Sequence, residues 1–312
     1  EKIKFTLKNP SKIPNLLKIR SGRASYNNLK NLISEKCEVD PGLLRFKQYN
    51  IEHHIAHTAS AYFASDQDYA AGLTVDGSGD FVSTMMTECA GNQIKPISKI
   101  YVPNSLGSFY TMICSFIGYD SYGDEGKVMG LAPLGKDTYH EIVKDMVHLN
   151  DKGFYLNSDW FAPFGSNQGI SIGKDGKMQI EKHYSNRMIE TFGEPRKRNS
   201  EITKRDMDLA YSLQHRFEEI YLDLLNKLHN HIPSKHLALA GGCALNSVAN
   251  GMAFERTPFE SMTIQPAAGD DGLSLGSALY VARSILQDGD RWVMENSYLG
   301  TEYSENEMEK CL

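Results

Sequence analysis

The chain has 312 residues, 41% of them hydrophobic and 23% charged, and carries a formal net charge of −6 at pH 7. This composition is ordinary for a globular protein with a sizeable core, and the negative charge disfavours nucleic acids and anionic membrane surfaces as partners. Five cysteines without a CxxC pair exclude a disulfide framework and a cysteine zinc site and indicate a reducing cytoplasm, and no apolar run approaches the ~20 residues of a membrane span.

Residues 1–50 are charged and weakly patterned, and we expect short helices there. The next stretch, IEHHIAHTASAYFAS at 51–65, has the pattern of an apolar helix. His53 and His57 are four residues apart, so a helix stacks both imidazoles on one face, whereas His54 points ~100° away. Such a pair can supply two ligands to a metal ion; the alternative is a solvated or core-capping histidine cluster.

Two strands and a helix are expected next. YAAGLTVDG (69–77) has the pattern of a buried strand that ends in a tight turn, and residues 81–103 predict a hairpin arm that turns at Gly91-Asn92. SLGSFYTMICSFIGY (105–119) predicts an apolar helix. Residues 150–200 are rich in Gly, Asn, Ser and Asp, and we interpret them as a loop-rich insertion.

The clearest predicted helix covers residues 207–232, because apolar side chains recur there at three- and four-residue steps and form one core-facing stripe. The stripe comprises Ala210, Leu213, Phe217, Ile220, Leu224 and Leu228. Two strand–turn–helix units follow, at 236–254 and 261–286. Three predicted strands therefore end in small, acidic or glycine-rich turns: VDGSGD (75–80), AGGCALN (240–246) and PAAGDDG (266–272). Turns of this kind lie along one edge of an α/β sheet, where ligands bind.

The glycines of these turns are candidate contacts for a phosphate, because backbone amides can approach an anion closely where no side chain intervenes. The candidates are Gly77, Gly79, Gly241 and Gly242, with Asn246 at the end of the second turn. Ordinary turn chemistry is the alternative. Lys127, in YGDEGKVMGLAP (122–133), is a candidate for the phosphate of a nucleotide or adenylate, against the alternative of a surface lysine.

Two carboxylates stand where predicted strands end. Asp76 and Asp270 each follow an apolar or small-residue stretch, where a carboxylate without a partner is costly, although each can also cap a turn. With His53 and His57 they form a set of two nitrogen and two oxygen ligands, which suits Fe(II), Mn(II) or Zn(II) better than Mg(II) or Ca(II). Asp271 is a rival for the second carboxylate, and spacing does not choose between the neighbours.

Four ordered blocks resemble a known family. HHIAHTASAYFASDQDYAAGLTVDGSGD, PNSLGSFYTMICSFIGYDSYGDEGKVMGLAP, LALAGGCALNSVANG and IQPAAGDDGLSLGSAL look like the O-carbamoyltransferases of the nodulation protein U, cephalosporin and tobramycin type. The resemblance runs from about residue 51 to YLGTEYS at 298–304. It implies an α/β protein with an actin/hexokinase-type ATPase fold and ribonuclease-H-like sheets, related to the catalytic subunit of tRNA threonylcarbamoyl-adenosine synthase.

The family implies an activity as well. Its enzymes transfer a carbamoyl group from carbamoyl-adenylate, made from carbamoyl phosphate and ATP with Mg²⁺, to the hydroxyl of a small-molecule acceptor. Carried over by position, the family's metal ligands are His53, His57, Asp76 and Asp270, and the metal is commonly Fe(II), with Mn or Zn as alternatives. His54 is then a neighbour that hydrogen-bonds substrate, and Lys127 assists departure of AMP.

Two departures from the family set the expected organisation. Residues 1–50 lack the family's HDSAA-like segment, so we expect them to belong to an N-terminally incomplete first lobe. Residues 51–304 are the expected carbamoyl-transfer domain, and 305–312 the expected start of a linker to a domain that forms carbamoyl-adenylate. A homodimer is compatible with the sequence. The rival functions are a sugar- or acid-kinase-like phosphotransferase of the same fold, which has no use for the histidine pair, and a non-catalytic nucleotide-binding scaffold.

Overall fold

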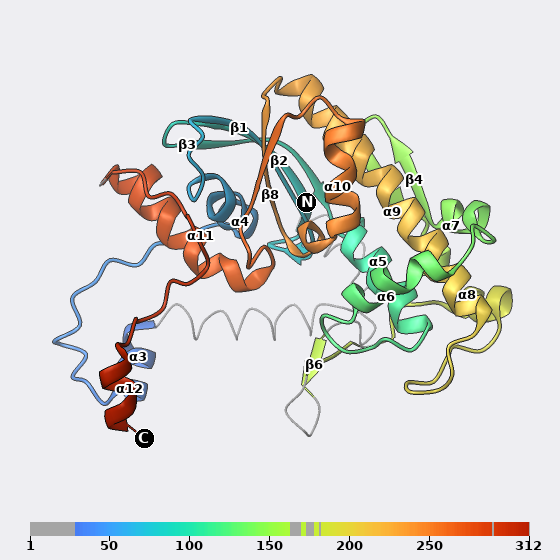
Figure 1. Ribbon diagram of the computed structural model, residues 1–312, viewed down its shortest axis with the longest axis horizontal. Helices are drawn as coiled ribbons and strands as arrows, with labels where there is room; N and C mark the ends of the chain where they lie inside the picture. Colours follow the sequence, from blue (N-terminus) through green and yellow to red (C-terminus); the bar gives the residue numbers. More distant parts are fainter. Residues whose placement is uncertain (1–28, 163–169, 173–177, 181, 289, 312) are drawn as a thin grey trace, which may run out of the picture. The chain divides into compact units, whose positions relative to one another are not determined.

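The computed structural model describes residues 29–162, 170–172, 178–180, 182–288 and 290–311 (Figure 1). The chain divides into two compact units, one of residues 1–50 with 163–168 and one of residues 51–162 with 169–312. In the first unit the described residues form helix α3 (Leu29–Cys37), which buries no side chain. The second unit contains the main sheet and every candidate site residue.

Five strands make the main sheet, in the order β3-β2-β1-β8-β9 (Figure 1). They are β1 (Tyr69–Gly79), β2 (Val82–Ala90), β3 (Gln93–Tyr101), β8 (His236–Ala240) and β9 (Ser261–Ile264). Strand β2 is antiparallel to β1 and β3, whereas β1, β8 and β9 are parallel. The carboxyl ends of β1 and β8 consequently lie at the same edge of the sheet. Two hairpins stand apart, β4 (Val147–Asn150) with β5 (Gly153–Leu156) and β6 (Ile170–Ile172) with β7 (Met178–Ile180).

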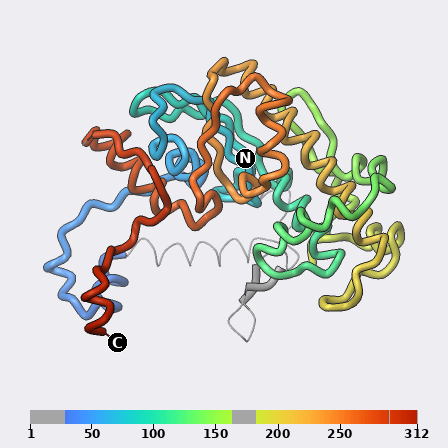
Figure 2. Tube along the Cα trace, viewed as in Figure 1, coloured from blue at the N-terminus to red at the C-terminus, as the bar shows by residue number. Residues whose placement is uncertain are grey.

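Helices cover both faces of this sheet (Figures 1 and 2). Helices α4 (His53–Tyr62) and α11 (Leu273–Tyr280) pack on one face, and α5 (Leu106–Phe116), α9 (Lys204–His231) and α10 (Ser247–Arg256) pack on the other. The remaining helices are α6 (Glu125–Leu131), α7 (His140–Met146), α8 (Asn186–Phe192) and α12 (Glu305–Cys311). Short helical turns are η2 (Ala132–Leu134), η3 (Ser158–Trp160), η4 (Gly242–Leu245), η5 (Asp270–Gly272) and η6 (Val281–Leu286).

Side-chain alternation along the strands divides the core into two layers. Leu73 and Val75 of β1 pack into the larger cluster with α5 and α9, whereas Ala70 belongs to the cluster on the α4 side. In β8 the leucines face α9 and the alanines face α4. Successive residues of a strand point to opposite faces, so the leucines and alanines of β8 are sorted onto different faces. The alanines on the α4 side are small, which allows α4 to lie close to the sheet.

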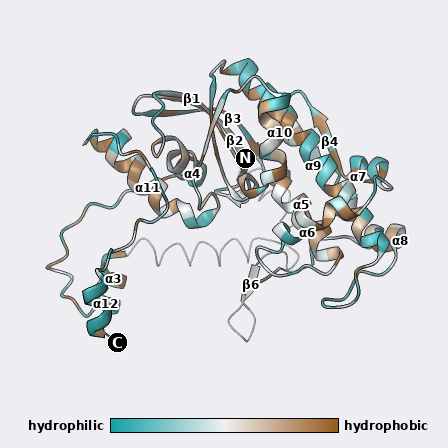
Figure 3. Cartoon of the chain, in the orientation of Figure 1, coloured by the Kyte–Doolittle hydropathy of each residue, from teal (hydrophilic) through white to brown (hydrophobic). Residues whose placement is uncertain are grey.

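The long helix matches its predicted pattern. Thr203 and Asp206 form a capping box at its start. All six residues of the predicted stripe are buried, and Figure 3 shows hydrophobic and hydrophilic residues alternating along α9. Among the described residues every helix is too short or too polar to cross a bilayer.

The strand ends differ from expectation in two places. Strand β1 continues through Gly79, with an irregular register after Val75, and the tight turn is formed by Asp80 and Phe81, whose φ angles are +49° and +70°. Gly77 and Gly79 are therefore strand residues, not turn residues. The Gly-Gly turn after β8 leads first into η4, and helix α10 begins only at Ser247. In the region expected to be a loop-rich insertion, residues 150–200, the regular elements are β5, β6, β7 and α8, while residues 163–169, 173–177 and 181 lie outside the described residues.

Candidate metal centre

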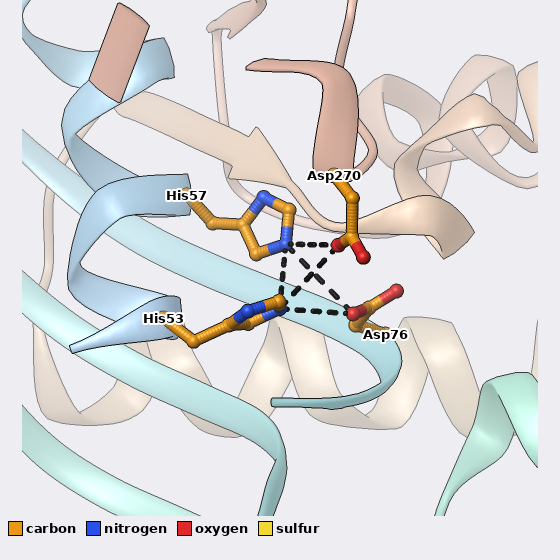
Figure 4. A group of neighbouring side chains, drawn as sticks. All are labelled: His53, His57, Asp76 and Asp270. Atoms are coloured by element: carbon orange, nitrogen blue, oxygen red, sulfur yellow. Dashed lines mark hydrogen bonds and ion pairs between the residues drawn. The ribbon is translucent and has the colours of Figure 1, made fainter. Parts of the chain in front are cut away.

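Four side chains from three segments meet at the carboxyl end of β1 (Figure 4). The Nε2 atoms of His53 and His57 lie 3.1 Å apart. Oδ2 of Asp76 lies 3.2 Å from Nε2 of His53 and 3.8 Å from Nε2 of His57. Oδ1 of Asp270 lies 3.5 Å from each of these nitrogens. One nitrogen or oxygen atom of each side chain therefore faces a common point.

Helix α4 supplies both imidazoles from its first two turns. The Glu52 side chain accepts a hydrogen bond from the backbone N–H of Ile55, which caps the helix start. Asp80, in the turn after β1, accepts from the backbone N–H of His53. A Cβ atom at Gly79 would lie 2.0 Å from Cγ of His53. The His53 ring can therefore lie against β1 only because residue 79 has no side chain.

Asp76 is held by the glycine turn that follows β8. The backbone N–H of Gly242 donates to Oδ1 of Asp76 at 3.1 Å, which leaves Oδ2 for the cluster. Gly241 has φ +90°, and a Cβ atom there would lie 2.4 Å from the carbonyl oxygen of Val75. A Cβ atom at Gly107 of α5 would lie 2.8 Å from the backbone nitrogen of Gly77. Close backbone packing from two sides therefore fixes the Asp76 carboxylate.

Asp270 reaches the cluster because α11 packs directly on α4. A Cβ atom at Gly276 would lie 1.9 Å from the carbonyl oxygen of Ala56, so only glycine permits this approach. Helix η5, immediately before α11, then carries Asp270 to the two histidines, and the neighbouring Asp271 is not part of the cluster. The structure thus separates the two aspartates that spacing alone left open.

The cluster shifts the protonation equilibria of its members. Burial alone would raise the pKa of Asp76, but the hydrogen bond with His53 and the nearby His57 imidazole outweigh it and hold the pKa well below its usual range. Burial alone would lower the pKa of His57, but Asp270 and Asp76 outweigh it and raise the pKa. Asp76 is therefore ionised, and a metal ion at this cluster would have to displace a proton from His57.

The dimensions of the cluster fit a divalent transition-metal ion. Metal–ligand bonds of about 2.0–2.2 Å place adjacent ligand atoms about 3.0–3.6 Å apart. The two imidazole nitrogens lie 3.1 Å from each other and 3.2 to 3.8 Å from the carboxylate oxygens, so small side-chain rotations suffice to enclose an ion. Two imidazoles and two carboxylates suit Fe²⁺, Mn²⁺ or Zn²⁺.

His54 has a different position from the one expected for a substrate contact. Its side chain is fully buried; Nδ1 lies 2.7 Å from Oγ1 of Thr74, and Nε2 lies 2.9 Å from the carbonyl oxygen of Val82. The carbonyl requires a donor, so Nε2 carries the proton and Nδ1 accepts from Thr74. Burial lowers the pKa of His54 to about 4. These contacts give His54 a structural role between α4 and the sheet and correct the expectation that it contacts substrate.

The predicted phosphate contacts are only partly available. The Gly242 amide is engaged by Asp76, and the Asn246 side chain caps α10 through the N–H of Ala249 and bonds with Gln214. Gly77 has open space where a Cβ atom would stand. Lys127 is largely exposed, pairs with Asp124 at 2.6 Å and lines a pocket of about 220 Å³. Tyr119, Arg196 and Arg198 also line this pocket, and none of the four metal-cluster residues does.

Two further residues near the cluster bear on its chemistry. Burial and the carboxylates of Asp270, Asp76 and Asp271 raise the pKa of Tyr122, a residue that sequence patterns did not single out. Its position beside glycine in YGDEGK was the only available signal. Burial, with Asp76 and Glu125, raises the pKa of the Cys243 thiol well above its usual range, which agrees with packing and not catalysis for this cysteine.

Most of the chain matches a known protein family. The family described as carbamoyltransferase N-terminus matches residues 24–279. The chain belongs to the carbamoyltransferase family. This agrees with the resemblance found in the four sequence blocks.

Relatives of the chain include two nodulation proteins. NolNO of Sinorhizobium fredii (strain NBRC 101917 / NGR234) is 32% identical over 276 residues, which cover 87% of this chain and 36% of that protein. NolO of Bradyrhizobium diazoefficiens is 30% identical, over 80% of this chain and 41% of that protein. The protein sll1178 of Synechocystis sp. is 37% identical, over 84% of this chain and 41% of its own length. The chain thus spans about two fifths of the length of these relatives.

A search of solved structures found the crystal structure of HypF from T. kodakarensis. It aligns over 84% of this chain and 39% of HypF, with 14% identity and a TM-score of 0.39.

Proposed function

We propose that this protein is a metal-dependent O-carbamoyltransferase, which moves a carbamoyl group to the hydroxyl of a small-molecule acceptor. Family membership supports carbamoyl transfer. The observation that carries the metal dependence is the convergence of two imidazoles and two carboxylates within 4.8 Å of one another. The rival kinase-like and scaffold functions have no need of that ligand set.

His53, His57, Asp76 and Asp270 would hold the ion, and Fe²⁺ is the proposed metal. A divalent ion supplies Lewis acidity, which polarises a carbonyl group and stabilises the negative charge that develops when a hydroxyl attacks it. The protein's own contribution is a preorganised set of ligands. The Gly242 amide and the glycine contacts at positions 79 and 276 set their positions before any substrate binds.

Tyr122 is the proposed hydrogen-bond donor near the cluster, whose carboxylates act on its pKa. Half of its surface is exposed, and the phenol is protonated at neutral pH, because an ordinary tyrosine pKa is about 10 and burial with these carboxylates raises it further. A neutral phenol beside three carboxylates can donate to an oxygen of the substrate. No side chain acts as a covalent nucleophile in this proposal, because the acceptor hydroxyl itself attacks.

We assign the carbamoyl donor by resemblance to the family. The donor is carbamoyl-adenylate, formed from carbamoyl phosphate and ATP with Mg²⁺ in a separate domain, and residues 51–304 carry the transfer step. The strand order, with β2 antiparallel to both neighbours, supports an actin/hexokinase-type fold with a ribonuclease-H-like sheet. Lys127 and its pocket are the proposed contact for the anionic part of this donor.

The test combines metal content with transfer. Protein loaded with Fe²⁺ in the absence of oxygen is assayed by elemental analysis and by AMP release from synthetic carbamoyl-adenylate with a set of sugar acceptors. His57→Ala should lose one equivalent of metal and the acceptor-dependent AMP release. His148→Ala removes a histidine that pairs with Asp145 outside the cluster and should change neither. Unchanged metal content in His57→Ala would disprove the ligand assignment; loss of metal with unchanged transfer would disprove metal dependence.

A further inference from the structure

A second group of histidines and a carboxylate lies between helix α9 and the segment at the start of α7, and it shares no residue with the first cluster. Asp137, His140 and His215 each offer one ligand atom, and these atoms lie within 4.8 Å of one another. Nδ1 of His215 is 3.0 Å from Oδ2 of Asp137, and Nδ1 of His140 is 3.6 Å from Oδ1 of the same carboxylate. The two imidazole rings lie 4.6 Å apart, centroid to centroid.

The segment that carries Asp137 and His140 is held firmly against α9. Asp208 of α9 accepts hydrogen bonds from the Lys136 backbone N–H at 2.9 Å and the Thr138 hydroxyl at 2.8 Å. Ser212, one turn further along, accepts from the Tyr139 backbone N–H at 3.2 Å. A Cβ atom at Gly135 would lie 2.0 Å from the carbonyl oxygen of Met207, so the chain touches the helix there.

The polar residues of α9 that meet this segment share one helix face. Asp208, Ser212, His215 and Glu219 recur at steps of four, three and four residues, which is the spacing of one face of an α-helix. The first two hold the segment by hydrogen bonds, and the last two meet His140 and Asp137. The backbone that carries these side chains is thus fixed against α9 by the fold.

The two ring nitrogens of His140 differ in their surroundings: one lies beside a carboxylate of α9, and the other makes no hydrogen bond among the described residues. Its Nε2 atom lies 3.5 Å from Oε1 of Glu219, whose other oxygen accepts from Arg216 at 2.6 Å. Its Nδ1 atom is buried and has no hydrogen-bond partner among the described residues. A histidine that binds a metal through one nitrogen typically has a carboxylate at the other nitrogen, and Glu219 occupies that position.

We propose that Asp137, His140 and His215 form a second divalent-metal site. Two imidazoles and one carboxylate favour a late first-row cation such as Zn²⁺, Co²⁺, Ni²⁺ or Cu²⁺. The side chains of His215 and Asp137 are 40% and 36% exposed, so the remaining coordination positions open to solvent. A bound ion links the segment before α7 to the middle of α9, and it stabilises the folded state because an ordered ligand set exists only there. The site is separate from the proposed transfer chemistry.

Zinc binding to the metal-free protein tests the proposal. Equilibrium dialysis should give two equivalents for the wild type, one for His57→Ala, one for His215→Ala and none for the double variant. In the His57→Ala protein, zinc should raise the melting temperature, and the additional His215→Ala change should abolish that shift. His148→Ala is the matched control, because His148 pairs with Asp145 at 3.6 Å but belongs to neither histidine–carboxylate group found among the described residues. It should leave every stoichiometry unchanged.

Asp137→Asn keeps the test decisive if His215→Ala impairs folding, since it changes one charge on an exposed segment. In the His57→Ala background it should weaken zinc binding at least tenfold. The proposal is overturned if the His57→Ala protein binds no zinc. It is equally overturned if that protein keeps its zinc after both His215→Ala and Asp137→Asn.

Discussion

Replacing Gly79 by Ala should displace His53 and remove most of the metal affinity of the first cluster. An added Cβ atom would lie 2.0 Å from Cγ, 2.1 Å from Cδ2 and 2.4 Å from Nδ1 of the His53 ring. Carbon atoms in contact normally stay about 3.5–4.0 Å apart, so the ring must retreat by about 1.5 Å. Because Cγ is close to the backbone, a rotation of the ring about its own axis does not relieve the clash.

The displacement is large compared with what coordination tolerates. Metal–ligand distances hold within about 0.2 Å, so a shift of this size removes the His53 imidazole from the ligand set. Loss of a supporting contact typically costs 10–100-fold in metal affinity, and loss of a ligand should cost at least the upper figure. We expect a drop of about a hundredfold or more, or about 3 kcal/mol of binding free energy.

Gly77→Ala is the matched control. It makes the same chemical change two residues earlier on the same strand, where no atom lies within 4 Å of an added Cβ. Neither glycine has a positive φ, so backbone strain does not distinguish them. Metal affinity is measured by chelator competition, with His215→Ala in every protein so that the second cluster does not contribute.

The result that would refute the reasoning is a Gly79→Ala protein that is folded and binds metal as tightly as Gly77→Ala. A double-variant cycle separates the clash from a general loss of fold. If the clash with the His53 ring is the cause, Gly79→Ala should destabilise the metal-free wild type but cost little in a His53→Ala background. Equal destabilisation in both backgrounds would place the strain elsewhere in β1.

Three further predictions concern protonation, ligand choice and the division of chemistry. The pKa of His54 is about 4 in the folded protein against 6.5 when unfolded, so its contribution is complete above pH 6.5 and is lost as the pH falls towards 4. In the metal-free protein, the free energy of unfolding of the wild type relative to His54→Gln should therefore fall by about 3 kcal/mol between these pH values, as measured by urea unfolding; parallel curves would contradict the buried neutral imidazole. Asp270→Asn should weaken metal binding by at least tenfold more than Asp271→Asn in calorimetric titrations, and the reverse order would mean that the neighbouring aspartate is the ligand. The 312-residue chain should bind metal yet release no sustained pyrophosphate from ATP and carbamoyl phosphate, and sustained release would show that adenylate formation resides in these residues.

Local periodicity was enough to predict much of the secondary structure and two of the four residues of the first cluster. The stripe along α9 and the spacing of His53 and His57 depend only on 3.6 residues per helical turn, so both could be predicted from neighbours in the chain. The strand–turn–helix pattern likewise predicted Asp76 and Asp270 at strand ends; Asp76 lies near the end of β1, whereas Asp270 lies in η5, beyond the end of β9 at Ile264. Parallel strands bring such ends to one edge of a sheet, which is why the pattern was informative about the site.

Tertiary packing decided the rest, because it depends on contacts between segments far apart in the chain. Asp270 and Asp271 are equivalent in sequence, and only the contact of Gly276 with Ala56 brings Asp270 to α4. The sequence position of His54 suggested a contact with substrate, but in the fold Thr74 and Val82 engage both of its ring nitrogens.

The glycines show the same limit of local patterns most clearly. Gly79 and Gly242 stand in glycine-rich segments of the kind that bind phosphate. In the fold, however, Gly79 makes room for the His53 ring, and the backbone N–H of Gly242 donates to Asp76. A glycine's sequence context says that the backbone can be approached closely. Which group makes that approach is set by the elements that fold against it.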